Sequence, residues 1–152
     1  MPLPNIFESA VCESLVGRIN RLTADAKPLW GKMSVDQMLC HCSLAFDQAL
    51  GNSNLRPGGF MRLMMKLFFK SSMINDVPYK QNLPTAPFFV VADKKDFEAE
   101  RKRVIALLQD FSKLGAAYYD NREQATLGKL SSVGWSNLMY KHIDHHLRQF
   151  GV

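Results

Sequence analysis

Apolar residues recur every three or four positions in four stretches of the sequence, and this spacing predicts four main helices. The stretches span about residues 5–22, 34–50, 96–114 and 132–150. In each stretch one face is apolar and the charged side chains fall mostly elsewhere, as in helices that pack around a shared core. We therefore predict an all-α fold, a four-helix bundle formed by residues 1–152 as a single domain.

Local sequence marks the ends of these helices. Ser34 and Gln37 have the spacing of a capping box, so we expect the second helix to begin there and to end before Gly51. Asp93 or Asp96 can cap the third helix, because a short side chain with an acceptor oxygen satisfies the free amides of a first turn. The predicted helix ends thus depend on side-chain chemistry as well as on hydrophobicity.

The middle of the chain departs from this pattern. Residues 60–70 predict an additional short helix rich in Met, Leu and Phe, with Arg62, Lys66 and Lys70 on one stripe. We interpret it as a crossover helix that covers the bundle, with a dimer face or a pocket lid as alternatives. A membrane-surface helix ranks last because the segment makes only about three turns. Residues 75–93 contain three prolines and predict a long extended crossover.

Composition and charge narrow the class of protein. No apolar run of 18 residues occurs, and the first residues lack the basic and apolar regions of a signal peptide, so we expect a cytoplasmic protein without a membrane partner. The three cysteines, Cys12, Cys40 and Cys42, are odd in number and lack C-x-x-C spacing, which favours reduced thiols. The net charge of +5 is spread along the chain, so we expect no nucleic-acid partner.

Three of the four histidines lie in the last predicted helix. His142 and His146 are four residues apart, so both imidazoles can converge on one metal ion, while His145 lies on the flank of their face. Lys141 is expected to point away from that face, as are Asp144 and Arg148. The alternative is a pair of core histidines that hydrogen-bond a neighbour and bind no ion.

The fourth histidine, His41, lies on the flank of the apolar stripe of the second helix, where it can line the edge of a cavity or lie at the surface. With the pair from the last helix it gives a three-histidine site that leaves a coordination position open for water or substrate. Cys42 is expected in the core and Cys40 to be semi-exposed. Either cysteine as a nucleophile or extra ligand is a weaker interpretation, because neighbouring residues on a helix splay apart.

Two segments resemble a known family. The run Gln37-Met-Leu-Cys-His-Cys42 and the run His142-Ile-Asp-His-His-Leu-Arg-Gln149 resemble the DinB-like, or YfiT-like, superfamily of metalloproteins, and the stretch Gly128–Gly151 is closest to an uncharacterised bacterial subfamily of it. The resemblance implies a four-helix bundle, often dimeric. It also implies a divalent metal, usually nickel or zinc, on His41, His142 and His146. Its members include thiol-dependent transferases and isomerases.

We therefore predict a divalent-metal-binding protein, a thiol-dependent transferase or isomerase or a hydrolase, that forms a homodimer and acts on a small molecule such as a low-molecular-weight thiol. Gln149 and His145 are the residues expected to support the ligands from behind. No carboxylate or lysine accompanies the histidines in a recognisable motif, so no general base is assigned. The alternative is a non-catalytic binding or dimerisation module with vestigial histidines.

Overall fold

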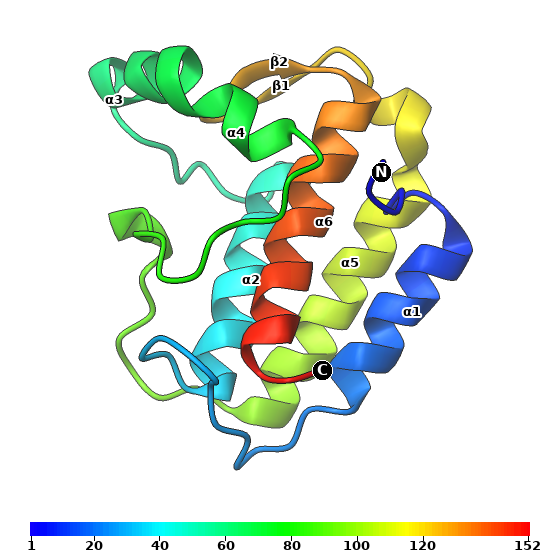
Figure 1. Cartoon of the computed structure of the whole chain (residues 1–152), viewed down its shortest axis with the longest axis vertical. Helices are drawn as coiled ribbons and strands as arrows, with labels where there is room; N and C mark the ends of the chain where they lie inside the picture. Colours follow the sequence, from blue (N-terminus) through cyan, green and yellow to red (C-terminus); the bar gives the residue numbers. More distant parts are fainter.

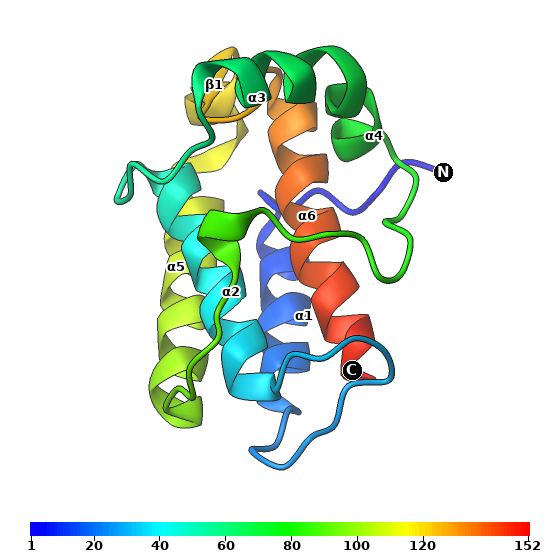
Figure 2. The same ribbon diagram turned by 90° about the vertical axis from the view of Figure 1, so that its left-hand side faces the viewer.

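A computed structural model describes residues 1–152 and is mostly helical. Four long helices lie side by side: α1 (Ser9–Asn20), α2 (Val35–Leu50), α5 (Phe97–Tyr119) and α6 (Ser132–Gln149) (Figures 1 and 2). We call these four helices the helical body. Within it α5 contacts each of the other three, and α6 also packs against α2. All four elements expected from the hydrophobic spacing are therefore present.

The core of the helical body is formed by the apolar faces that the periodicity indicates. Burial of this surface is the main contribution that holds the helices together. The residues with at most 1% of their surface exposed include Ile6, Leu15, Ile19, Met38, Leu39, Phe46, Val104, Leu108, Phe111, Leu127, Ile143 and Leu147.

The predicted caps are confirmed at two helices. Ser34 and Gln37 form the capping box of α2, whose last turn ends at Gly51 in the left-handed conformation. Asp96 caps α5, and its side chain accepts a hydrogen bond from the amide of Ala99 at 2.7 Å. The choice left open between Asp93 and Asp96 is thereby settled.

The helix ends differ from the expectation elsewhere. α1 is shorter than the periodicity suggested, because residues 5–8 form a turn that precedes it. α5 runs past the expected end near residue 114 to Tyr119, with a break at Gly115, whose φ of +84° is favourable only for glycine. A short antiparallel hairpin that the sequence did not reveal, β1 (Arg122–Gln124) and β2 (Gly128–Leu130), then leads into α6.

The mid-chain helix is longer than expected. It comprises α3 (Gly59–Met64), a π-helical segment (Met65–Phe69) and α4 (Lys70–Ile74), which follow one another without a gap. It lies across the end of the helical body, beside the hairpin (Figures 1 and 2). The chain then returns along α2 as an extended segment that contains one 3-10 turn, Pro87–Phe89. None of the helices in the structure is both long and apolar enough to cross a bilayer.

Two side chains contradict the expected exposure. Lys141, expected to point away from the apolar face, is only 2% exposed, because the mid-chain helix covers that side of α6. Cys40, expected to be semi-exposed, is 5% exposed, on the side of α2 that faces Glu100 and Arg103 at the start of α5. An element outside the four helices covers Lys141, and long side chains at the start of α5 reach Cys40. A helical wheel of a single helix represents neither neighbour.

Candidate metal centre

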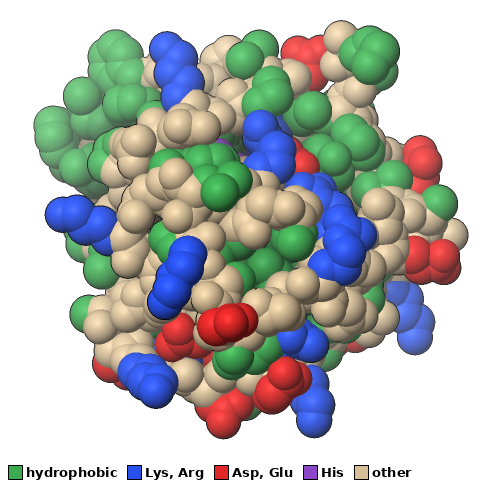
Figure 3. All heavy atoms as spheres, turned by 60° about the horizontal axis from the view of Figure 1, so that its bottom comes forward, with side chains coloured by type: hydrophobic (Ala, Val, Ile, Leu, Met, Phe, Trp, Pro, Cys, Tyr) green, Lys and Arg blue, Asp and Glu red, His purple; other side chains and the backbone are tan.

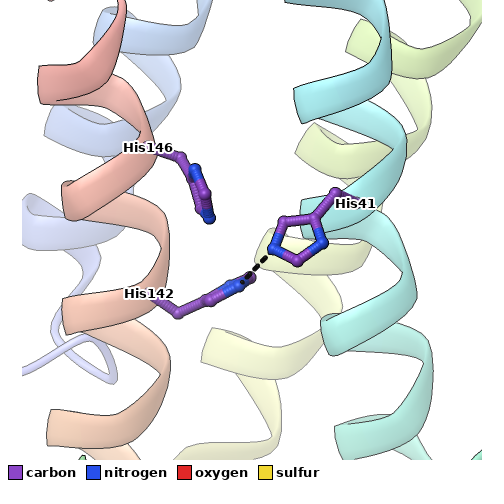
Figure 4. Close-up of side chains that lie close together, drawn as sticks. All are labelled: His41, His142 and His146. Carbon is purple, nitrogen blue, oxygen red and sulfur yellow. Dashed lines mark hydrogen bonds between the residues drawn. The ribbon is translucent and has the colours of Figure 1, made fainter. Parts of the chain in front are cut away.

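Three histidines from two helices meet inside the protein. His41 projects from α2 toward α6, and His142 and His146 project from successive turns of α6 toward α2 (Figure 4). One nitrogen from each ring lies within 4.8 Å of the others, and Nε2 of His142 is 2.9 Å from Nε2 of His41. The structure therefore brings together the three residues that the spacing singled out.

The ring of His41 is oriented by the backbone of the crossover segment. Its Nδ1–H donates a hydrogen bond of 2.9 Å to the carbonyl oxygen of Phe89, in the 3-10 turn. A carbonyl can only accept, so the proton of the neutral ring resides on Nδ1 and Nε2 carries the lone pair. His41 thus presents a ligand atom toward α6.

The ring of His146 is oriented by Gln149, one turn further along α6. The Oε1 atom of Gln149 accepts from Nδ1–H of His146 at 2.8 Å, and its Nε2 donates to the carbonyl oxygen of Trp30 at 2.8 Å. The bond to Trp30 fixes which end of the amide faces the imidazole. His146 therefore also keeps its proton on Nδ1 and its lone pair on Nε2. Histidines that bind metals commonly show this arrangement, with the second ring nitrogen donating to a hydrogen-bond acceptor.

A glycine makes room for this arrangement. Gly31 has a φ of +79°, and a Cβ atom built there would lie 2.6 Å from Nε2 of Gln149. Only glycine fits at this position without displacing the amide. The loop that precedes α2 is thereby packed directly against the residue that orients His146.

His142 differs from the other two histidines. Because Nε2 of His41 carries a lone pair, the 2.9 Å contact requires that Nε2 of His142 donate its proton to His41. The Nδ1 atom of His142 is buried and has no hydrogen-bond partner. A metal ion bound at this site would take the place of the proton between the two Nε2 atoms. That proton can move to Nδ1 of His142, which leaves Nε2 of His142 free to bind the ion.

Burial keeps all three rings neutral. It lowers the pKa of His41, holds the pKa of His142 well below its usual range together with the neighbouring imidazoles, and lowers the pKa of His146 to about 3. No carboxylate contributes to any of these three shifts. Neutral imidazoles are the form that binds a metal, so protons compete weakly with an ion here.

The spacing suits a metal after a small adjustment. A tetrahedral ion with metal–nitrogen bonds of about 2 Å separates two ligand nitrogens by roughly 3.3 Å. The pair at 2.9 Å must open slightly, and the third nitrogen, within 4.8 Å, must move closer. Rotations about the side-chain torsions of the histidines supply such movements. Three protein ligands leave one position free, as in catalytic zinc sites.

His145 does not hydrogen-bond to the three rings. It is 8% exposed and packs edge-on against His146, with ring centroids 5.2 Å apart, between Trp30 and Tyr79. It contributes to the wall of the site, as does Phe89, whose ring meets that of His41 edge-on. On the face shown in Figure 3, histidine is visible only as a small area among other side chains.

Lys141 joins the crossover to α6 beside the site. Its ammonium donates to the carbonyl oxygens of Ser72 and Asn75 at 2.7 and 3.2 Å, donates to Oδ1 of Asn75 at 2.9 Å, and lies over the ring of Tyr79. Burial lowers its pKa to about 8. Asp144 points away from the histidines, as expected, and pairs with Arg18 and Arg148.

Sequence reasoning missed the two backbone groups that orient the histidine rings. The Phe89 carbonyl is brought to His41 by the chain path, and no side-chain pattern marks it. The same holds for the Trp30 carbonyl, which accepts a hydrogen bond from Gln149, the partner of His146. The proline-rich sequence before Phe89 was the only available sign that this segment follows a fixed path.

Comparisons with known proteins identify a family but no function. The family model described as "Protein of unknown function (DUF1569)" matches residues 9–151. No curated protein and no solved structure matches.

Proposed function

Because this chain belongs to the DUF1569 family, whose description assigns no activity, we propose its function from the site: a divalent-metal-binding protein with His41, His142 and His146 as ligands. The observation that carries the proposal is the orientation of two of these rings. Phe89 and Gln149 hold protons on the outer nitrogens of His41 and His146, which leaves both inner nitrogens as lone-pair donors toward one point.

We further propose a catalytic role for the ion, in a thiol-dependent transferase or isomerase, or in a hydrolase. When bound, a divalent ion supplies Lewis acidity at the free position and lowers the pKa of a coordinated water or thiol. The protein supplies three neutral ligands and no carboxylate, so the full positive charge of the ion acts on a small anionic or thiol substrate. Three imidazoles suit zinc or nickel.

The finer structural assignment remains part of the proposal. We place the helical body in the four-helix bundle class and in the DinB-like, or YfiT-like, superfamily. The support is that one histidine of α2 and two of α6 lie at the positions that the resemblance implies. A homodimer remains a prediction of the same resemblance.

Metal analysis of purified protein tests the proposal. The wild-type chain, expressed with added zinc and nickel, should retain close to one ion per chain, and His142→Ala should retain almost none. His145→Ala is the matched control, because it removes a buried histidine of the same helix that is not a ligand. Equal and negligible metal in wild type and His142→Ala would refute the proposal.

One observation favours a second candidate, a binding module without a metal. Both nitrogens of His41 already have protein partners, the Phe89 carbonyl and Nε2 of His142. Histidines that satisfy each other's hydrogen-bonding groups in this way can be purely structural, with no role beyond joining α2 to α6. In that case zinc and chelators would leave the melting temperature unchanged, whereas an ion that binds only the folded chain must raise it.

A further inference from the structure

The mid-chain helix carries an unusual concentration of exposed apolar side chains. Each is 51–76% exposed, although the helix rests on the rest of the protein through its other side. We call this surface the apolar ridge, and it consists of Phe60, Met61, Leu63, Leu67, Phe68 and Phe69. Single exposed apolar residues are ordinary, but six on one continuous helix mark a surface that contacts something else.

The ridge faces outward because the basic side of the same helix faces the hairpin. Arg62 pairs with Glu123 at 3.9 Å, and the ammonium of Lys70 donates to the carbonyl oxygen of Lys129 at 2.8 Å. Lys66 lies so close to Gly128 that a Cβ atom there would be 2.8 Å from its Cε. The cations lie beside the hairpin, and Met65, Met73 and Ile74 pack against the core, so the six residues of the apolar ridge are left uncovered within this chain.

The helix is also held in place rather than loosely attached. Asn137 donates to the carbonyl oxygen of Ile74 at 2.8 Å, and Lys141 donates to Ser72 and Asn75. These contacts tie its final turn to α6. The helix that carries the apolar ridge is therefore held at a fixed place, across the end of the helical body (Figures 1 and 2).

The charge of this region is strongly positive. Residues 51–75 contain Arg56, Arg62, Lys66 and Lys70 and no acidic residue, which accounts for most of the net charge of +5. The next acidic residue in the chain, Asp76, follows the helix and contributes to the environment of Lys141. Two copies meeting through this surface would bring two such positive regions together, and like charges oppose that contact.

From these observations we propose that the apolar ridge binds the surface of a membrane that contains anionic phospholipid. A helix lying in the plane of the interface, with bulky apolar side chains entering the acyl region and cations beside them, is the usual form of such binding. Arg56 and Lys66 remain exposed, and their positive charge, which a second copy would repel, complements anionic headgroups. A ridge of Phe, Met and Leu side chains can also enter fluid lipid without shape complementarity. A protein partner would have to provide a surface of matching shape.

This geometry sets the orientation of the bound molecule. The helix would lie along the membrane, and the helical body would stand away from it, because the helix lies across the end of that body (Figure 2). A membrane partner is the opposite of the sequence expectation, in which a membrane-surface helix ranks last because residues 60–70 make only about three turns. The continuous helical segment is longer and runs from Gly59 to Ile74.

Vesicle sedimentation tests the proposal with the full-length protein. Vesicles of an equimolar mixture of phosphatidylglycerol and phosphatidylcholine should bind the wild type, and pure phosphatidylcholine vesicles should bind at least about tenfold more weakly. Leu67→Ser/Phe68→Ser removes two side chains that are 65% and 66% exposed, and should weaken binding about a hundredfold. The matched control is Val77→Ser/Leu83→Ser, at positions 62% and 51% exposed in the crossover, which should bind as wild type.

Three outcomes would overturn the proposal. One is equal binding by both double variants, and another is equal binding to the two vesicle types. The third is a wild-type protein that does not bind vesicles. This includes the case in which size-exclusion chromatography shows a wild-type dimer that Leu67→Ser/Phe68→Ser dissociates, which would make the apolar ridge a dimer face. Circular dichroism of each variant confirms that a loss of binding is not a loss of folding.

Discussion

Replacing Gln149 tests how the candidate metal centre is built. In Gln149→Leu, Nδ1–H of His146 loses its acceptor and the carbonyl oxygen of Trp30 loses its donor, at a side chain that is only 4% exposed. Two hydrogen bonds at about 1 kcal/mol each, with two buried groups left unpaired, predict a loss of roughly 2–4 kcal/mol of folding free energy. Without an acceptor behind His146, we expect zinc affinity to fall about 10–100-fold.

Competition with a chromophoric chelator measures the zinc affinity, and urea denaturation measures the free energy of unfolding. Gln48→Leu is the matched control: Gln48 also makes two hydrogen bonds, donating to Leu55 and accepting from Gln124, but it does not contact the histidines. It should lose stability and keep its zinc affinity.

Gln149→Glu separates the two roles of the amide. A carboxylate can still accept from Nδ1–H of His146, but it cannot donate to the Trp30 carbonyl. We expect this variant to lose stability while it binds zinc far better than Gln149→Leu. Loss of the acceptor behind His146 should weaken zinc binding by far more than about twofold. If folded Gln149→Leu bound zinc within about twofold of the wild type, the inferred orientation of His146 would be wrong.

Three further predictions concern the rest of the site. Excess zinc at about a hundredfold over its dissociation constant should stabilise the fold by about 3 kcal/mol and raise the melting temperature by roughly 5–10 °C; no shift in scanning calorimetry would contradict a metal site. Burial lowers the pKa of His146 from 6.5 to about 3, so this ring gains a proton on unfolding between those values. Metal-free protein should therefore be about 2 kcal/mol less stable at pH 5 than at pH 7 through this ring, and His146→Gln should reduce the difference in urea denaturation. Lys141→Met leaves the carbonyls of Ser72 and Asn75 unpaired and should cost about 2 kcal/mol, with faster amide exchange in residues 70–79; unchanged exchange would argue against the tie to α6.

The helices of the body could be predicted because their determinants are local. Ser34 and Gln37 satisfy amides of their own first turn, and the buried faces follow the 3.6-residue period. The continuation of α5 beyond Gly115 and the hairpin were missed for the opposite reason. A glycine at this point is compatible with either the end of a helix or a bend within it, and three-residue strands have no periodicity to detect.

The histidine cluster could be anticipated from spacing, but its surroundings could not. His142 and His146 must share a face of any regular helix, whereas the burial of His41 at 4% exposure depends on the crossover that packs over α2. Side chains at the start of α5 lie beside the buried Cys40, and the mid-chain helix covers Lys141. Those contacts join residues far apart in the chain, so no local pattern reveals them.

The contact between Gly31 and Gln149 gives a surface loop influence over a buried imidazole. A larger residue at position 31 would displace the amide that accepts the hydrogen bond from His146, although positions 31 and 149 are 118 residues apart along the chain. Random mutagenesis scored by zinc retention should consequently recover changes at this glycine alongside changes at the histidines themselves. A change at an exposed glycine would thus disturb the candidate metal centre without altering any of its three histidines.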